Sequence, residues 1–420
     1  MNPEDIKILE RWKTRNQLSP TTYKTYKSVM QHYSTCCNQS LQELYNEAIT
    51  EEEQAIPRYR RSIKNHILDY YNYLENQDFT ETTKNNHIKV IRSFYKHLDV
   101  EVPDIQNKYE ATPIPENNNK NITKDLIKLM INNATTRDKA ILSIACMTGQ
   151  SPDEIRNITI QQLINCYNTE LETPLFTAED ILQNKNQILK LKAPRLDMYR
   201  RKTKNKYWVY LPSETTQHII NYLHERINGT NTKLRIQSND DPLFVTKRGT
   251  KFTTTAVSAL FMVIGERCGF ENPTTFDAKT RLLLTRSGGE HRLWRAYNFR
   301  KYFINTCRRY AGTHEGTTYN FTGLELADFW VGHKVKGSIQ HYIQYNYDDI
   351  DYMQQQYYQV LPYLSMEYDV QELTTKDKQE FLALKKQYET LSEELSIMKE
   401  YLESKAFVEQ MQKQIRDDEK

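Results

Sequence analysis

Apolar residues recur at helical spacings of three and four along most of this 420-residue chain, and glycine is scarce. One such stripe, at Tyr26, Met30 and Tyr33, follows the helix-start pair Ser19-Pro20. There are 12 glycines, where an average composition of about 7% would supply roughly 29. Glycine is the residue that tight turns need most, so its scarcity argues against a fold of many short strands. The pattern predicts a mainly α-helical protein.

Shifts in pattern divide the chain into four predicted segments. Residues 1–102 repeat helical stripes and predict a helical bundle. Residues 103–120 hold three prolines and three consecutive asparagines without an apolar period, as a linker does. Residues 121–365 predict an α-rich domain with a small antiparallel sheet. In residues 366–420, seven apolar residues alternate spacings of three and four: Phe381, Leu384, Tyr388, Leu391, Leu395, Met398 and Leu402. This tail is predicted to form a coiled coil, with a long helix folded back on the body as the alternative.

The larger predicted domain contains three distinct patterns. Residues 137–147 (RDKAILSIACM) are nearly continuous in apolar side chains and predict a helix in the centre of a core. The β-rich runs LKLKA and YWVYLP flank the basic sequence RRKTKNK, which predicts a strand, a basic turn and a second strand. Helical patterns return after Pro212 and continue to about Tyr363.

Several classes of protein are excluded by composition. No apolar run reaches the roughly 18 residues of a membrane-spanning helix, and the start MNPEDIKILERWKTR lacks the apolar region of a secretory signal. We therefore expect an intracellular protein, cytoplasmic or nucleoid-associated, that is neither secreted nor bound to a membrane. The six cysteines lack zinc-ligand spacing, so neither a metal site nor a disulfide framework is expected. A net charge of +3 does not by itself argue for nucleic-acid binding.

Five residues stand out by their order and spacing. Lys202 lies in the predicted basic turn, and Arg300 ends the sequence YNFR within a basic amphipathic helix. Gly332 and His333 follow, and Tyr342 stands nine residues after His333. The spacing is the specific feature, because a single tyrosine means little in a chain that has 29.

In this order the motifs resemble those of the tyrosine recombinase (integrase) family, especially its archaeal and viral-type members. The resemblance extends to about Tyr363 and implies a helical core-binding, DNA-clamping domain in residues 1–102 and a catalytic domain in residues 121–365. It implies that Tyr342 is the nucleophile and that Arg300 and His333 stabilise charge on the scissile phosphate. It further implies that Lys202 protonates the leaving 5′ oxygen. Tyr345 and Tyr347 are alternatives to Tyr342, and Lys204 and Lys206 are alternatives to Lys202.

The sequence departs from the family pattern at two positions. Ser151 stands where the first arginine is expected, two residues after Thr148-Gly149, and Tyr297 replaces the histidine of the H-x-x-R motif. Ser151, Pro152 and Glu154 form a helix-capping pattern, which accounts for Ser151 structurally. We assign Ser151, Tyr297 and Arg156 to the predicted catalytic pocket. The candidates that would replace the missing guanidinium are Arg156, Arg137, Arg292 and Arg295.

The resemblance implies a site-specific recombinase or integrase of a mobile element or virus, acting through a 3′-phosphotyrosine intermediate without cofactor, metal or ATP. The implied partner is double-stranded DNA, bound by a homo-oligomer (dimer or tetramer) on paired sites. The basic residues expected to bind DNA are Arg200, Arg201, Lys204, Lys206 and Lys301.

Three alternatives remain at this point. The first is a catalytically impaired, integrase-derived DNA-binding protein, and the second is a strand transferase like a type IB topoisomerase, which shares the chemistry. The third is a scaffold that functions through its tail.

Overall fold

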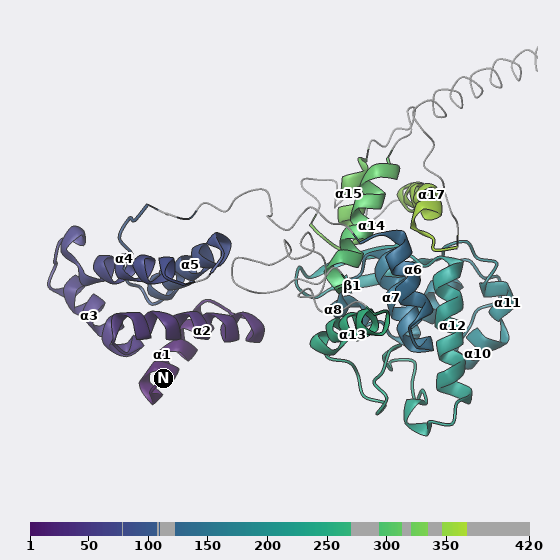
Figure 1. Cartoon of the computed structure of the whole chain (residues 1–420), viewed down its shortest axis with the longest axis horizontal. Coiled ribbons are helices and arrows are strands. Elements are labelled where there is room, and N and C mark those ends of the chain that lie inside the picture. Colours follow the sequence, from purple (N-terminus) through teal and green to yellow (C-terminus); the bar gives the residue numbers. More distant parts are fainter. Residues whose placement is uncertain are drawn as a thin grey trace, which may run out of the picture. The chain divides into compact units, whose positions relative to one another are not determined.

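The computed structural model describes residues 1–77, 79–106, 109, 122–269, 294–312, 321–334 and 347–367. Within these residues the fold is mainly α-helical with a small antiparallel sheet, as the sequence predicts (Figure 1). The predicted heptad tail lies outside the described residues, apart from its first two positions. None of the described helices is long and apolar enough to cross a membrane.

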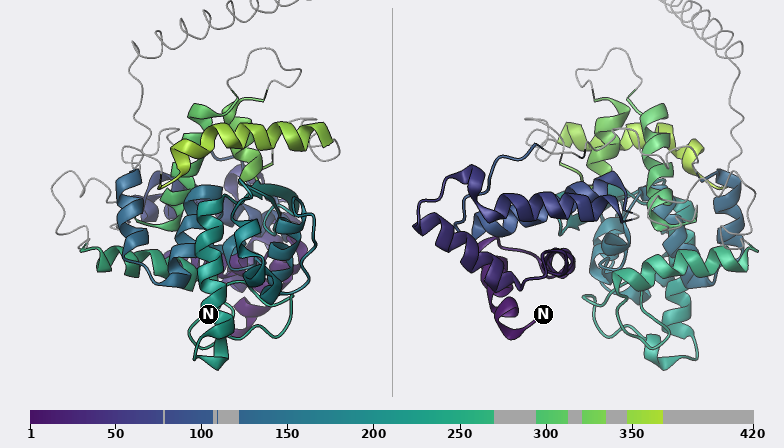
Figure 2. Two further views of the ribbon diagram at one scale, coloured as in Figure 1. Left: turned by 90° about the vertical axis from the view of Figure 1, so that its right-hand side faces the viewer. Right: turned by 60° about the vertical axis from the view of Figure 1, so that its left-hand side comes forward.

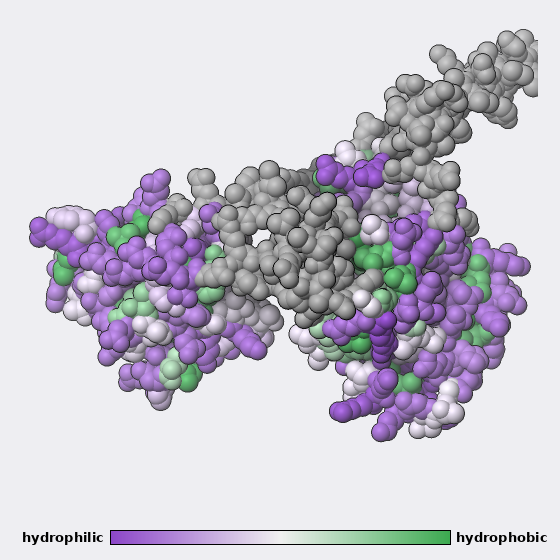
Figure 3. Space-filling view, viewed as in Figure 1, coloured by the Kyte–Doolittle hydropathy of each residue, from purple (hydrophilic) through white to green (hydrophobic). Residues whose placement is uncertain are grey.

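The first hundred residues fold around a hydrophobic core of their own. The helices are α1 (Pro3–Arg15), α2 (Pro20–Cys37), α3 (Leu41–Glu53), α4 (Ser62–Glu75) and α5 (Glu81–His97), with a 3-10 turn at Arg58–Arg60. Local capping fixes where several of them begin, because the Ser19 and Thr80 side chains accept backbone N–H groups of the first turn. Large aromatic side chains fill the core, with Trp12, Tyr33 and Phe94 fully buried. The surface over these helices is mostly hydrophilic (Figure 3).

This core reaches beyond residue 102. Ile105 and Tyr109, which lie in the segment predicted as a linker, are buried against it. The Tyr109 hydroxyl donates a hydrogen bond to the Tyr71 carbonyl oxygen at 3.2 Å. The start of the predicted linker therefore belongs to the packing of the N-terminal helices.

A second core is built by the residues that follow. Its first elements are α6 (Lys124–Asn132), α7 (Thr136–Thr148), α8 (Pro152–Ile155), α9 (Ile160–Asn168), α10 (Ala178–Gln183), α11 (Lys185–Ile188), β1 (Arg195–Arg200) and β2 (Asn205–Tyr210). They are followed by α12 (Ser213–Asn228), a 3-10 turn at Thr232–Leu234, α13 (Thr254–Arg267), α14 (Ala296–Tyr310), α15 (Gly323–Trp330) and α17 (Tyr347–Leu364).

Helix α7 occupies the centre of this second core, as predicted. Its residues from Ala140 to Thr148 are all buried, and α6, α12, α14 and α17 pack around it (Figures 1 and 2). Each fully buried Ile or Leu side chain stabilises the fold by about 2 kcal/mol. Polar groups inside the helix are paired, because the Ser143 hydroxyl lies 2.8 Å from that of Thr215. This buried hydroxyl of α7 therefore has the hydrogen-bond partner that burial requires.

The hairpin of β1 and β2 agrees with the predicted strand, basic turn and strand, but its first strand begins later. The register pairs Arg195 with Tyr210 at one end and Arg200 with Asn205 at the other. The run LKLKA (residues 189–193) is not a strand, since Leu189 N–H bonds back to the Lys185 carbonyl oxygen in a continuing helical turn. The prediction was wrong here because alternating Leu and Lys also fits a short helical turn.

The prediction of continuous helix after Pro212 was also wrong in part. Between α12 and α13 the described chain is irregular apart from the 3-10 turn, and Val245 and Lys251 form an isolated antiparallel bridge. The Arg226 side chain holds this segment by donating to the carbonyl oxygens of Leu234, Pro242 and Leu243 at 2.7–3.1 Å.

Candidate active site

Arg300 projects from α14 into the interior of the second part of the chain. Phe299 and Phe303 anchor α14 in the core, and the Arg300 side chain beside them is 7% exposed. Its Nη1 donates to the Gly149 carbonyl oxygen at 3.1 Å and its Nη2 to that of Val331 at 2.7 Å. Burial and the neighbouring positive charge of Arg200 lower the pKa of Arg300. An arginine nevertheless stays charged, so this is a fixed buried cation.

His333 lies against Arg300, although 33 residues separate them in the chain. Its Nε2 is 3.2 Å from Arg300 Nη2, and its Nδ1 is 2.7 Å from Oδ1 of Asp328 in α15. Because the carboxylate and the guanidinium have fixed roles, Nδ1 carries the proton and Nε2 accepts from Arg300. Burial lowers the pKa of His333, and the charges of Arg300 and Arg200 lower it further, against the Asp328 hydrogen bond. The imidazole is therefore neutral with an acceptor at Nε2.

Glycine is required on both sides of this pair. Gly149, at the end of α7, has φ +68°, and a Cβ there would lie 2.4 Å from the Phe303 ring. Gly332 also has φ +68°, and its Cβ would lie 2.7 Å from the ring of Tyr207. L side chains rarely adopt this conformation, and neither position has room for one. The predicted Gly-His pair thus has a structural reason for its glycine.

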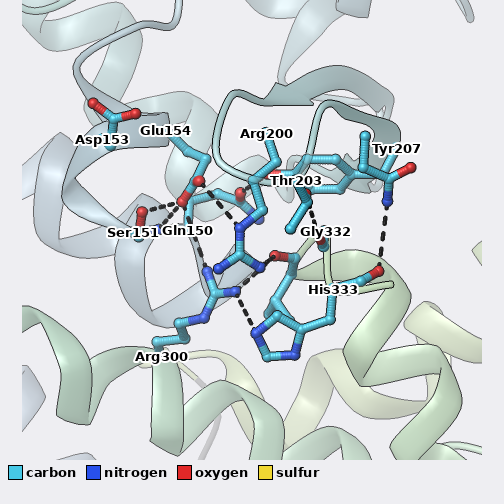
Figure 4. A network of polar contacts seen from close by, with 12 residues as sticks. Gln150, Ser151, Asp153, Glu154, Arg200, Thr203, Tyr207, Arg300, Gly332 and His333 are labelled. Atoms are coloured by element: carbon cyan, nitrogen blue, oxygen red, sulfur yellow. Dashed lines mark hydrogen bonds and ion pairs between the residues drawn. The ribbon is translucent and has the colours of Figure 1, made fainter. Parts of the chain in front are cut away.

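Glu154 is the carboxylate of the cluster. It accepts hydrogen bonds from the Ser151 backbone N–H at 3.0 Å and from the Ser151 hydroxyl, which confirms the capping interpretation of this helix start. Its side chain is 6% exposed and lies 3.7 Å from both Arg300 Nη1 and Arg200 Nε. Ser151 therefore binds Glu154, and Glu154 in turn lies close to both arginines (Figure 4).

The hairpin is fastened to the Gly-His segment by several hydrogen bonds. Arg200 Nη1 donates to the Val331 carbonyl oxygen at 3.0 Å, and the Thr203 hydroxyl to that of Gly332 at 3.4 Å. Inside the contact, the Tyr207 hydroxyl donates to Gln150, whose Nε2 donates to the Trp330 carbonyl oxygen at 2.9 Å. The strand β2, the end of α7 and the end of α15 are thereby linked (Figure 4).

The basic turn between the strands faces outward. Lys202 lies within it and is exposed, and so are Arg201, Lys204 and Lys206. Because Thr203 binds Gly332, the backbone beside Lys202 is held next to the Arg300–His333 pair. Lys301 follows Arg300 in α14 and is partly buried, and burial lowers its pKa.

The other predicted pocket residues have different surroundings. Tyr297 is 63% exposed, and the Arg295 guanidinium lies 5.2 Å from its ring centroid. Arg156 pairs with Asp153 at 2.8 Å and donates to Thr254 at 3.1 Å. Arg137 likewise pairs with Asp138. Among the described residues, none of these groups contacts Arg300 or His333.

Several predicted residues lie outside the described residues. They are Tyr342, its alternative Tyr345 and the arginine candidate Arg292. Tyr347 begins α17.

Sequence reasoning missed the contribution of Arg200 and Glu154 to the cluster. Arg200 was assigned only to DNA binding, and Glu154 only to the cap. Their pairing left no signal in the sequence, because Glu154 becomes a buried acid in need of a cationic partner only when its helix packs beside the end of β1.

Two solved structures resemble this chain in part. The crystal structure of XerA recombinase matches with 18% sequence identity and a TM-score of 0.32, covering 83% of this chain and 98% of that one. The integrase from mycobacterium phage Brujita matches with 12% identity and a TM-score of 0.33, covering 88% and 95%. No protein-family model matches the sequence, and the search of curated proteins finds no match. Matches at this level of similarity do not support a function. The functional proposal therefore rests on the geometry of the site.

Proposed function

We propose that this protein is a site-specific DNA recombinase that cuts and rejoins DNA through a 3′-phosphotyrosine intermediate on Tyr342. The observation that supports it best is the 3.2 Å contact between Arg300 and His333, two motif residues 33 positions apart. The hairpin that bears Lys202 is bonded to the same Gly332–His333 segment. Three separate segments singled out by the motif thus meet at one buried cluster.

The chemistry follows from the states of these groups. The phenol of Tyr342 loses its proton to Nε2 of His333, and the resulting imidazolium is balanced by Asp328. The phenolic oxygen forms a bond to phosphorus while the bond between phosphorus and the 5′ oxygen breaks. The leaving 5′ oxygen takes a proton from the Lys202 ammonium. Arg300 stabilises the charge that builds on the non-bridging oxygens.

The role proposed here for His333 differs from the one expected from the motif. The family motif implies charge stabilisation by His333 as a hydrogen-bond donor. Its Nδ1 is committed to Asp328 and its Nε2 accepts from Arg300, so the neutral ring has no donor left for a phosphate. When Arg300 turns to the phosphate it releases the lone pair of Nε2, and a base with a carboxylate behind it suits proton removal better.

The wider assignment follows the same reasoning. The substrate is double-stranded DNA, whose phosphates are bound electrostatically by the exposed Arg201 and Lys204 of the turn and Lys206 at the start of β2. Residues 1–102 clamp the duplex as a core-binding domain, and residues 121–365 form the catalytic domain. A dimer or tetramer on paired sites, encoded by a virus or mobile element, completes the proposal. No metal or ATP enters the reaction, since the phosphotyrosine conserves the bond energy.

The decisive experiment uses a nicked suicide duplex built from the ends of the element that carries this gene, incubated with chelator. We expect the wild type to form a denaturation-resistant protein–DNA adduct. Tyr342→Phe removes the nucleophile and abolishes the adduct, whereas the matched control Tyr345→Phe retains it.

Each other outcome has a definite meaning. Binding of the duplex without any adduct overturns the proposal and favours the integrase-derived DNA-binding protein. If Tyr345→Phe loses the adduct and Tyr342→Phe retains it, the nucleophile is Tyr345. Relaxation of supercoiled DNA that lacks any paired site favours the type IB topoisomerase alternative.

A further inference from the structure

Arg200 is nearly as enclosed as Arg300. Its side chain is 14% exposed, against 7% for Arg300. It comes from the end of β1, where the other basic residues of the hairpin turn face solvent. A long cationic side chain usually keeps its head in water, so its burial here needs a reason.

Among the described residues, the buried charges of the cluster do not balance. Arg200 and Arg300 share one buried carboxylate, Glu154, at 3.7 Å from each. The other acid nearby, Asp328, has a side chain that is 36% exposed and is bound to His333. Two buried cations beside a single buried anion are costly in a medium of low dielectric constant. An anion that enters between them removes this cost.

The two guanidinium groups also converge on one acceptor. Both donate to the Val331 carbonyl oxygen, Arg200 at 3.0 Å and Arg300 at 2.7 Å. Figure 4 shows them side by side next to the His333 ring. Arg200 Nε is buried and makes no hydrogen bond within the described part of the chain. The pair presents planar donors at one place, as phosphate recognition requires.

We propose that Arg200 is a second catalytic guanidinium, which contacts a non-bridging oxygen of the scissile phosphate and supplies the positive charge that Ser151 does not. This inference rests on the proposed function and adds one participant to its reaction. The bonds made and broken and the proton transfers stay as written above. Arg200 lowers the barrier by holding charge that develops on the phosphate oxygens.

The test compares two suicide duplexes, one with a natural scissile phosphate and one with a methylphosphonate, in which a neutral methyl replaces a charged oxygen. Adduct formation is measured at saturating protein for the wild type, Arg200→Ala and Arg200→Lys. We expect Arg200→Ala to slow the natural reaction by about 100-fold, which is typical for the loss of one such donor. On the methylphosphonate, the same variant loses less than about tenfold, because less charge needs stabilising. The rate of Arg200→Lys falls between those of the wild type and Arg200→Ala, because a lysine ammonium keeps the charge but lacks the planar pair of N–H donors.

Arg195→Ala is the matched control. Arg195 lies at the opposite end of the same strand and pairs with Asp197 at 3.2 Å. We expect Arg195→Ala to form the adduct at the wild-type rate on both duplexes. Arg200→Lys also covers the case in which the alanine variant does not fold, because it retains the stem and the charge.

The outcomes distinguish a failure of this inference from a failure of the proposed function. If the wild type forms the Tyr342 adduct and Arg200→Lys reacts at the wild-type rate, the role of Arg200 is overturned while the recombinase function stands. Equal losses of adduct rate on both duplexes in Arg200→Ala also overturn it, because the effect of a purely structural role does not depend on the charge of the phosphate. If the wild type forms no adduct, the proposed function fails and this inference fails with it.

Discussion

The Nδ1 of His333 lies 2.7 Å from Oδ1 of Asp328, five residues earlier in the chain. This carboxylate fixes the tautomer that leaves Nε2 as an acceptor towards Arg300. Asp328→Asn places an amide there, whose N–H groups favour the opposite tautomer. We expect the rate of adduct formation to fall by about 100-fold, a usual loss when a proton acceptor is disabled. Duplex affinity, measured by gel shift, stays unchanged; a parallel loss of affinity would contradict this interpretation.

The adduct rate should also depend on pH in a specified direction. Burial, Arg300 and Arg200 hold the pKa of His333 below its ordinary value of 6.5, despite Asp328. Protonated His333 increases as the pH falls, and only the neutral ring accepts the phenol proton. We therefore expect no loss of rate attributable to His333 between pH 8 and the ordinary histidine range (about 6.5), and a decline only below it. Single-turnover rates across this range test it, and a midpoint at or above the ordinary value would be inconsistent with the structure.

Glu154→Gln should lower the free energy of unfolding without changing the fold. The substitution removes the buried anion that lies 3.7 Å from both Arg200 and Arg300, the one such acid in the described part of the chain. Breaking a buried ion pair of this kind costs about 3 kcal/mol. Urea unfolding measures the change, and added phosphate should recover part of it by binding between the arginines. Stability equal to the wild type would show that the two cations do not need Glu154.

Gly332→Ala should affect both stability and chemistry. The residue has φ +68°, and its Cβ would lie 2.7 Å from the Tyr207 ring. The strained backbone and the contact together cost about 2 kcal/mol. Because His333 follows directly, we also expect a slower adduct. Gly229→Ala is unsuitable as a control, since its Cβ would meet a backbone oxygen at 2.2 Å, whereas Gly269 has open space around it. Gly269→Ala therefore serves, with the strain of its φ of +75° alone.

Lys202→Ala tests the leaving-group proton. Lys202 is exposed in the turn, so its removal leaves the core intact. We expect adduct formation to slow by about 100-fold or more on an ordinary duplex. A duplex with sulfur in place of the 5′ oxygen should react at nearly the wild-type rate, because a thiolate leaves without a proton. If Lys204→Ala shows this rescue and Lys202→Ala does not, the acid is Lys204.

The local parts of this fold were predictable because their causes lie within a few residues. Ser19 caps the helix that Pro20 begins, and the apolar run in residues 137–147 forms the buried helix α7. The turn at Lys202 followed from the basic sequence between two β-rich runs. LKLKA failed because its alternation is short enough to fit a helical turn as well.

The candidate site was predictable as a set of residues but not as an arrangement. Motif order and spacing selected Arg300, His333 and Lys202, and the structure places the first two in contact. Neither the partnership of Glu154 with Arg200 nor the shared Val331 carbonyl oxygen is visible in the sequence, because the residues come from α8, β1 and the end of α15.

The sequence by itself determined the helices, their caps, the hairpin and the identity of the motif residues, since hydrophobic period and capping act over one or two turns of chain. Only the tertiary structure decided the charge state and direction of each group. Burial beside Arg300 sets the pKa of His333, Asp328 sets its tautomer, and the hydrogen bond to the Val331 carbonyl oxygen directs Arg200 inward. Electrostatic effects depend on distance and burial, and both arise when distant segments pack together.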